Sequence, residues 1–370
     1  MTLDMRLFSR FVSLSALRAE FPVLERAAYL NAGTDGPLPA AATRAAAAEL
    51  ERELLEGRSV AHFKRRTELT DALRTAYAAL LGCDTADLAL TTCTTEGIAQ
   101  TIGGLELARG DEILTSDEEH PGLLGALAAA SELHGVEIRE APLGELAEAV
   151  GSRTRLVACS HVGWMSGSFA PAELAELEVP VLLDGAQGVG AVPVDVHALG
   201  CDAYAGAGQK WLCGPDGTGM LYVTPGLRER LSVSRRGYGN LADPSAGVNA
   251  SLHEDARRFD TLALNAETVA AALAAVEVLG EAGWAAVHER AISLAASLAE
   301  QLAELEGREP APRGPSTLVS FASEDPDGER VRLAEAGVIL RNIPDRPWLR
   351  ASVGAWNDEN DLDRLLTTLT

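Results

Sequence analysis

The stretch that decides the fold reads Ala207-Gly208-Gln209-Lys210-Trp211-Leu212-Cys213-Gly214-Pro215 and leads into the apolar run 220–223. It carries one of the chain's two lysines; the other, Lys64, lies in a charged stretch that predicts a solvated helical face. Arginine stays protonated in proteins, whereas a buried lysine can lose its proton and act as a nucleophile. Lys210 is therefore a candidate Schiff-base lysine, although the stretch taken alone fits a surface lysine in a loop better.

A second candidate lies 26 residues upstream, where the apolar run 181–183 ends in Asp184. A carboxylate at the carboxyl end of a parallel strand points into the crevice where α/β proteins bind ligands. Strand-end aspartates are also frequent turn residues. Pyridoxal 5'-phosphate (PLP) needs a lysine for its aldehyde and a carboxylate to keep its pyridine nitrogen protonated. Asp184 and Lys210 fit those two roles.

Two more candidate groups each follow a strand-like run. Thr94 and Thr95 come after the run 88–91 and open a predicted helix, where hydroxyls and free backbone N–H groups bind anions. The same letters also fit an ordinary capping box. His120 comes after the run 112–115 and could stack on a cofactor ring, although a lone histidine is more often structural. The order and spacing of all four stretches favour the functional interpretation.

These stretches, in this order, resemble the class V aminotransferase family of PLP enzymes, which includes cysteine desulfurases, isopenicillin N epimerase and carbon–sulfur lyases. The likeness runs from residue 29 to the C-terminus and includes the motifs 29–37, 160–164, 209–215 and 257–259 and the arginines Arg341 and Arg350. The resemblance implies an α/β fold of PLP fold type I, with a mostly parallel sheet in a large domain and a smaller α+β C-terminal domain.

The resemblance also implies roles around the cofactor. Lys210 would carry it and move the substrate's α-proton, Asp184 would pair with the ring nitrogen, and His120 would stack on the ring. Gln187 would approach the ring's phenolic oxygen. Gln209 stands where the family usually has histidine, and its amide can still donate to phosphate.

The phosphate and substrate contacts follow in the same way. Thr95, with Thr94 beside it, would hold the phosphate through its hydroxyl and backbone N–H. Arg350 would clamp the substrate α-carboxylate, because guanidinium matches carboxylate bidentately. Arg341, nine residues earlier, would bind the distal end of a cystine-like substrate. A surface salt bridge is the alternative for both arginines.

At three further positions the resemblance gives a less specific indication of a role in the active site. Trp164 stands where desulfurases have a cofactor-contacting asparagine, although an aromatic residue is more often packing than catalytic. Asn31 belongs to the loop that lines family active sites. Ala263 replaces a threonine that usually reaches the partner subunit's phosphate, so that contact is in doubt.

The expected function is β-elimination from cysteine, cystine or a related sulfur amino acid, giving pyruvate, ammonia and a thiol or persulfide. No cysteine occurs between Val338 and Arg350, where a desulfurase needs a nucleophilic one. Transamination and epimerisation share the α-proton step and stay open as alternatives. A non-catalytic binding protein is the alternative of another class, supported by the departures at Ala207, Gln209 and Ala263.

Composition limits the partners. The net charge of −23, from 54 acidic and 31 basic residues, argues against nucleic acid and anionic membranes. No apolar run approaches the ~20 residues that span a bilayer. Five cysteines without a CxxC or other metal spacing predict reduced cytoplasmic thiols and no metal site. The expected assembly is a homodimer with sites at the subunit interface.

The chain divides by pattern into an N-terminal arm (1–30), a large PLP-binding domain (31–260) and linking helices with a small domain (261–370). Residues 5–12 predict an amphipathic leader helix. Helices are expected at 40–56, 60–80, 266–280 and 283–304, with strands at 88–92, 112–115, 155–159, 180–184, 202–205 and 218–223. Residues 140–150 are expected to connect strands through another helix. Residues 234–256 predict a long functional loop.

Overall fold

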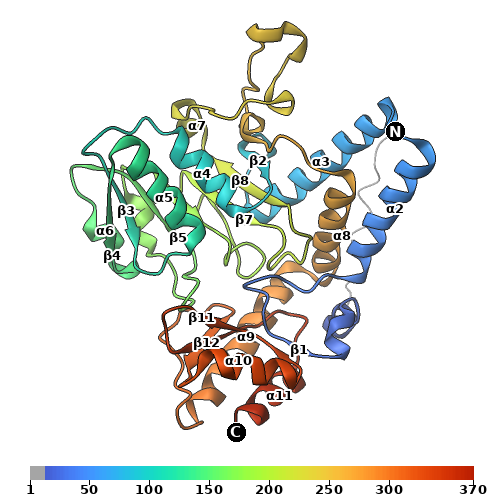
Figure 1. The fold of residues 1–370 in the computed structure, drawn as a ribbon, viewed down its shortest axis with the longest axis vertical. Coiled ribbons are helices and arrows are strands. Elements are labelled where there is room, and N and C mark those ends of the chain that lie inside the picture. Colours follow the sequence, from blue (N-terminus) through green and yellow to red (C-terminus); the bar gives the residue numbers. More distant parts are fainter. Residues whose placement is uncertain (1–12) are drawn as a thin grey trace.

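In the computed structural model, which describes residues 13–370, a large sheet and a small sheet form two separate layers of the molecule (Figure 1). The large sheet has the strand order β2-β8-β7-β6-β5-β3-β4, and all its neighbours run parallel except β8, which is antiparallel to β2 and β7. Its strands are β2 (Leu88–Thr91), β3 (Glu112–Ser116), β4 (Glu137–Ala141), β5 (Thr154–Ser160), β6 (Val181–Asp184), β7 (Ala203–Ala207) and β8 (Gly219–Val223). This arrangement confirms the predicted parallel sheet.

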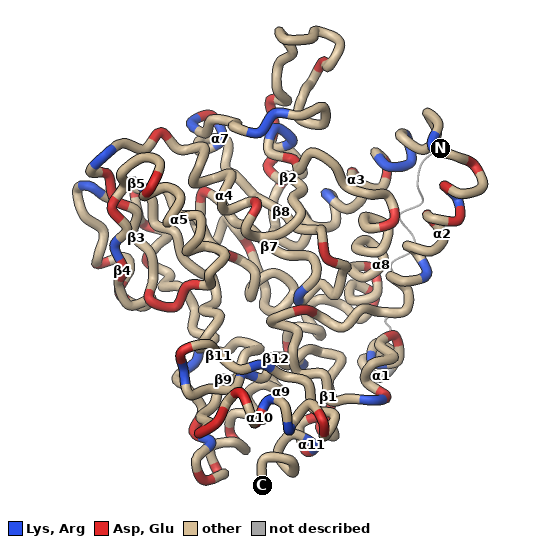
Figure 2. The backbone as a smooth tube through the Cα atoms, viewed as in Figure 1, with Lys and Arg blue, Asp and Glu red and all other residues tan. Residues whose placement is uncertain are grey.

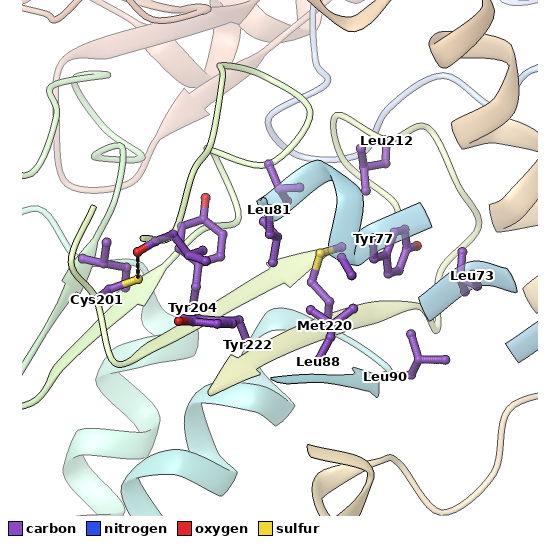
Figure 3. Close-up of a cluster of buried hydrophobic side chains, with 14 of the residues drawn as sticks. Leu73, Tyr77, Leu81, Leu88, Leu90, Cys201, Tyr204, Leu212, Met220 and Tyr222 are labelled. Atoms are coloured by element: carbon purple, nitrogen blue, oxygen red, sulfur yellow. Dashed lines mark hydrogen bonds between the residues drawn. The ribbon is translucent and has the colours of Figure 1, made fainter. Parts of the chain in front are cut away.

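Helices cover both faces of this sheet. One group comprises α2 (Ala40–Glu56), α3 (Val60–Leu81) and α8 (Ala266–Ala282), and the other comprises α4 (Thr94–Gly104), α5 (Pro121–His134) and α7 (Pro225–Arg230). Successive side chains of a strand point to opposite faces. Leu88 and Leu90 therefore pack with the α3 side chains Leu73 and Tyr77, as Figure 3 shows, while Ala89 belongs to the core beneath α4. Burial on both faces explains the continuous apolar runs.

The predicted connecting segment at 140–150 needs correction at its start. Residues 137–141 form the edge strand β4, and a single helical turn, α6 (Leu146–Ala149), follows. Strand β4 reads Glu-Ile-Arg-Glu-Ala, and its side chains are exposed or half-buried. Because the strand pairs on one side only and faces water, it lacks the apolar run that marked the other strands.

The small unit, residues 318–369, has its own sheet and core. Its strands β9 (Leu318–Ala322), β11 (Arg341–Ile343) and β12 (Trp348–Ser352) pair antiparallel in the order β11-β12-β9. The helices α9 (Trp284–Ala303), α10 (Pro326–Glu335) and α11 (Glu359–Leu369) pack around it. This antiparallel sheet with its helices confirms the predicted smaller α+β C-terminal domain.

The N-terminal segment connects the two sheets. Helix α1 (Leu14–Ala19) carries Arg18, which binds Asp361 of α11 at 2.7 Å. Strand β1 (Ala28–Tyr29) pairs with β10 (Val338–Ile339). The chain then crosses to the large sheet, where Gly36 N–H donates to the Gln209 carbonyl at 2.7 Å. A Cβ on Gly36 would lie 2.0 Å from the Lys210 carbonyl oxygen, so only glycine allows this approach. The leader helix predicted at 5–12 lies outside the described residues.

Residues 234–256 form a loop with short helical turns that extends away from the large sheet at the top of Figure 1. Within residues 13–370, no single helix is long and apolar enough to cross a membrane. Helices α8 and α9 meet that test of length and composition only when taken together, and they are bent by 81° relative to each other.

Candidate active site

The predicted site residues converge because they follow strands of one sheet. Asp184 is the last residue of β6, His120 follows β3, and Lys210 lies in the loop after β7. Thr94 begins α4 shortly after β2. The carboxyl ends of parallel strands meet at one edge, which is where α/β sheets bind ligands. The small unit and the segment 31–36 lie against this edge.

Lys210 is held in surroundings that favour its neutral amine. Burial lowers the pKa of Lys210 to about 8, because removing an ammonium from water disfavours the charged form. The carboxylate of Asp184 opposes this shift, and the guanidinium groups of Arg350 and Arg341 reinforce it. An amine with this pKa is partly unprotonated near neutral pH, as a nucleophilic lysine requires.

Asp184 is a buried carboxylate with one oxygen left for a ligand. In the described part of the chain its hydrogen bond comes from the backbone N–H of Ala186, which donates to Oδ1 at 2.9 Å. Burial raises the pKa of Asp184, while Lys210 and the Ala186 hydrogen bond lower it. Its Oδ2 atom can therefore accept a hydrogen bond from a protonated ring nitrogen.

His120 is fixed in orientation and in tautomer. It caps α5, since the backbone N–H of Gly122 donates to its Nδ1 at 3.0 Å. Burial lowers the pKa of His120 to about 4, and Lys210 and the two site arginines add to the shift. A neutral imidazole that accepts at Nδ1 carries its proton on Nε2. Its ring meets the Trp164 ring edge-on, 5.1 Å between centroids.

The start of α4 can hold an anion. The N-cap residue Cys93 makes no side-chain cap, which leaves the first N–H groups of the helix available. The buried Thr94 Oγ1 and Gln209 Oε1 have no hydrogen-bond partner among the described residues. Glu96 does not form the expected capping box. It accepts from Thr92 N–H and Oγ1, both at 2.6 Å.

Gln187 has a more constrained role than the sequence implied. Its amide nitrogen donates to the Gly33 carbonyl at 2.7 Å, and its oxygen accepts from Trp211 Nε1 at 3.0 Å. One amide hydrogen is left for the phenolic oxygen of a cofactor ring. A Cβ on Gly33 would lie within 2.9 Å of Gln187 Oε1 and 2.8 Å of Arg350 Nη2. Glycine therefore keeps this part of the site open.

Arg350 is the least compensated charge of the site. It is 0% exposed, and its Nη1 donates to the Trp164 carbonyl at 2.6 Å. Its Nε and Nη2 atoms have no partner in the described part of the chain. Burial and the neighbouring Arg341 lower the pKa of Arg350 to about 9. A buried, unpaired guanidinium is costly, so it calls for an anionic ligand such as a carboxylate.

Arg341 lies beside Arg350 as its register partner across β11 and β12. Both guanidinium groups stack against the ring of Trp164, at 5.3 Å for Arg341 and 5.9 Å for Arg350. Burial lowers the pKa of Arg341. Two cations on one indole give the site a second position for an anion, next to the first.

The segment from residue 31 contributes two buried polar atoms without a hydrogen-bond partner. Asn31 Oδ1 and Thr34 Oγ1 have no partner within residues 13–370, and neither has Ser352 Oγ on β12. Asn31 was predicted, whereas Thr34 and Ser352 were missed. Ser352 shares a strand face with Arg350, and this spacing of two residues was the signal available for it.

Among the described residues no group of three or more His, Cys, Asp or Glu side chains could hold a metal ion. All five cysteines are free, and burial raises the pKa of Cys213, the one nearest Lys210 in sequence, well above its ordinary value. A thiolate nucleophile is therefore not favoured at that position.

Comparisons with known proteins agree with this geometry. Residues 28–365 match the aminotransferase class-V family. Isopenicillin N epimerase of Streptomyces clavuligerus is 29% identical over 378 residues, covering 92% of this chain and 93% of that protein. The cysteine desulfurase of Yersinia pestis (strain Pestoides F) is 27% identical over 404 residues, covering 96% and 97%.

Two solved structures of one enzyme, C-DES, are also similar. A mutant with glycine covalently linked to its PLP cofactor superposes with a TM-score of 0.90 at 30% identity, covering 95% of this chain and 98% of that one. The complex of the cystine C–S lyase C-DES with its product cysteine persulfide has a TM-score of 0.89 at 29% identity, covering 94% and 98%.

The site's own atoms fit PLP. The group requires an amine, a carboxylate and an anion site. Lys210 would supply the amine, the free oxygen of Asp184 would accept from a protonated ring nitrogen, and the open start of α4 with Thr94 and Thr95 suits a phosphate. The unpartnered Thr94 hydroxyl is the clearest sign that a polar group belongs there.

Proposed function

The chain belongs to the aminotransferase class V family, whose members depend on PLP, and we propose that it is a lyase that cleaves the carbon–sulfur bond of cystine, cysteine or a related sulfur amino acid. The observation that carries the proposal is the pair of guanidinium groups, Arg350 and Arg341, that both lie against the ring of Trp164. Two adjacent anion positions suit an amino acid with a carboxylate at each end, as cystine has.

The chain's residues would divide the work. Arg350 binds the α-carboxylate through Nε and Nη2, and Asn31 pairs with Ser352, two residues further along the same strand. The amine of Lys210, largely neutral above about pH 8, removes the α-proton, a step that general base catalysis speeds ~10²–10⁴-fold. Bound PLP supplies the electron sink for the carbanion. Asp184 Oδ2 would keep the ring nitrogen of that group protonated. With water, the overall reaction would release the β-sulfur group as a thiol or persulfide and give pyruvate and ammonia.

The positions and burial of the cysteines support an elimination that uses no enzyme thiol. No cysteine lies in β11, β12 or the turn between them, residues 341–352. Cys213 is fully buried with a raised pKa. Transfer of sulfur to an enzyme cysteine, the desulfurase reaction, therefore has no acceptor at the Arg350 side of the site. The five free cysteines also fit our proposal of a cytoplasmic location.

We also propose a homodimer. The α2–α3 hairpin exposes Leu54 and Val60, both more than 80% accessible, and Phe63 at 55%. A cavity of about 300 Å³ between α3 and the loop after residue 237 is lined in part by Tyr238 and Ala263. Exposed apolar groups of this kind mark interaction surfaces. Ala263 has no hydroxyl that could bind a partner's phosphate. Sedimentation velocity of the purified protein tests the dimer, and a monomer that retains full activity would contradict it.

The function is tested by incubating the purified protein with cystine in the absence of a keto acid. We expect pyruvate, ammonia and a persulfide in equal amounts, with faster turnover of cystine than of cysteine because a persulfide leaves more readily than a thiolate. Product formation that depends on a keto acid would show transamination. Inversion at the α-carbon without pyruvate would show epimerisation, and no change in any amino acid would favour the binding protein.

A variant sharpens the test of the second anion position. Arg341→Gln should raise the KM for cystine about 10-fold or more, since a hydrogen bond to a charged group contributes ~1.5–3 kcal/mol. It should leave the KM for β-chloroalanine, which has one carboxylate, nearly unchanged. Arg346→Gln is the matched control, because Arg346 lies over Trp348 rather than Trp164. Equal losses for both substrates in Arg341→Gln would refute the assignment.

A further inference from the structure

Glu119 is a buried carboxylate beside the site that none of the roles above uses. It is 5% exposed and lies between the ends of two strands. Its Oε1 accepts from Ser116 Oγ at 2.5 Å and from Ser160 N–H at 2.9 Å. Its Oε2 accepts from Ser160 Oγ at 2.7 Å. Burying a carboxylate is costly, and three hydrogen bonds offset that cost only in part.

The partners of Glu119 lie on the edge of the sheet that forms the site. Ser116 ends β3 and Ser160 ends β5. Ser160 is the register partner of Asp184 on β6, and the next backbone N–H, of His161, donates to the Asp184 carbonyl at 2.9 Å. In the sequence, Glu119 directly precedes His120. One carboxylate thus connects the loop that carries the imidazole to β5, the strand that pairs with β6 at Asp184.

The two acidic residues before Glu119, Asp117 and Glu118, accept hydrogen bonds from other parts of the chain than Glu119 does. Asp117 accepts from Leu143 N–H at 3.1 Å, beyond the edge strand β4. Glu118 accepts from Ser166 N–H at 3.2 Å and from Ser166 Oγ at 2.5 Å, in the loop after Trp164. The three consecutive carboxylates hold one loop in three directions. Only the bond of Glu119 runs toward Asp184.

We propose that Glu119 is a positioning residue that fixes the imidazole of His120 relative to the carboxylate of Asp184, and so sets the geometry in which PLP is held. The Gly122 hydrogen bond to Nδ1 restricts the imidazole from the other side. Without Glu119, the loop loses its link to β5 and the Ser160 N–H is left buried without a partner. The backbone that carries His120 then loses one of its anchors, and the imidazole is held by the Gly122 hydrogen bond alone.

Three variants separate positioning from general stability. Glu119→Ala removes the link. Glu119→Gln keeps it, because the amide oxygen can accept from Ser116 and from Ser160 N–H while the amide nitrogen donates to Ser160 Oγ. Asp117→Ala removes a carboxylate from the same loop but on the side away from the site. Each is purified with PLP, and the visible circular dichroism per bound cofactor and the Kd for PLP are measured.

Glu119→Ala should lose more than half of the cofactor's visible dichroism and raise the Kd at least 10-fold, whereas Glu119→Gln and Asp117→Ala should stay within about 3-fold of wild type. In combination with His120→Ala, Glu119→Ala should add little, because both changes remove the same imidazole contact. A lower Tm with unchanged dichroism and Kd, or fully additive effects with His120→Ala, would overturn the proposal. Should Glu119→Ala fail to fold, Ser160→Ala, which removes only the Oε2 bond, must reproduce the change in dichroism for the proposal to stand.

Discussion

Replacing Glu119 by glutamine should remove a pH-dependent cost of folding from the protein without cofactor. Burial raises the pKa of Glu119 from 4.5 to about 7; hydrogen bonds from Ser116 and Ser160 oppose the shift, and the charge of Asp184 adds to it. Because the folded-state pKa lies above the unfolded one, the folded chain holds its proton between pH 4.5 and about 7 while the unfolded chain releases it. Stability contributed by this group therefore falls as the pH rises through that window.

The size of the effect follows from the gap between the two pKa values. At about 1.4 kcal/mol per unit, the gap corresponds to about 3 kcal/mol of folding free energy lost between pH 4.5 and 7. Glutamine has no proton to lose. We therefore expect Glu119→Gln to gain about 2–3 kcal/mol relative to wild type on going from pH 5 to pH 8. The stability difference between variant and wild type at pH 5 is subtracted from the same difference at pH 8. Groups whose titration the substitution does not change cancel in this subtraction.

Urea unfolding at pH 5 and pH 8, followed by tryptophan fluorescence, measures this quantity. Glu118→Gln, a neutralisation at the partly exposed neighbour, controls for the substitution itself. A stability difference between Glu119→Gln and wild type that is the same at both pH values would refute the reasoning. So would a variant that becomes less stable, relative to wild type, at the higher pH.

Three further outcomes are expected. The protein without cofactor should trap PLP on Lys210 with borohydride, at a rate that rises with pH and levels off above about 8; Lys210→Ala should show no such adduct by mass spectrometry, with Lys64 as the internal reference. Arg350→Lys should raise the KM for amino acids ~10–100-fold and leave the PLP Kd unchanged, because one ammonium cannot replace the open Nε and Nη2 donors. Cys213 has a φ of 54°, so Cys213→Val should lower the free energy of unfolding by about 2 kcal/mol, whereas Cys213→Gly should stay within about 1 kcal/mol by thermal denaturation.

The sequence predicted most of the large sheet because burial on both faces leaves a simple signature. Runs such as 88–91 and 219–223 are buried at every position. The edge strand at 137–141 escaped prediction because none of its five residues is fully buried and three of them carry charge. The helices were easier, because their apolar spacing does not depend on which sheet they cover; 266–280 and 283–304 became Ala266–Ala282 and Trp284–Ala303.

The site was predicted in part, for a related reason. Lys210 and Asp184 follow strands whose ends must meet in a parallel sheet, so their proximity follows from the fold class. The contacts of Gln187 with Gly33 and Trp211 depend on how a distant loop crosses the sheet, and the sequence carries no signal for that. The bond between Glu119 and Ser160 spans 41 residues and has the same origin.

The chain as a whole is acidic, whereas its candidate substrate site contains two neighbouring arginines, Arg350 and Arg341. Acidic and basic residues are interspersed along residues 13–370, as Figure 2 shows, and the net charge of the full sequence is −23. At the site, however, Arg350 and Arg341 lie together, and neither forms a salt bridge with a carboxylate of residues 13–370. The buried Arg350 guanidinium is a cost to the fold until an anion binds. A ligand that binds only the folded state raises its stability by mass action. A dicarboxylate should therefore raise the Tm more than a monocarboxylate does, and this gain should vanish in Arg341→Gln.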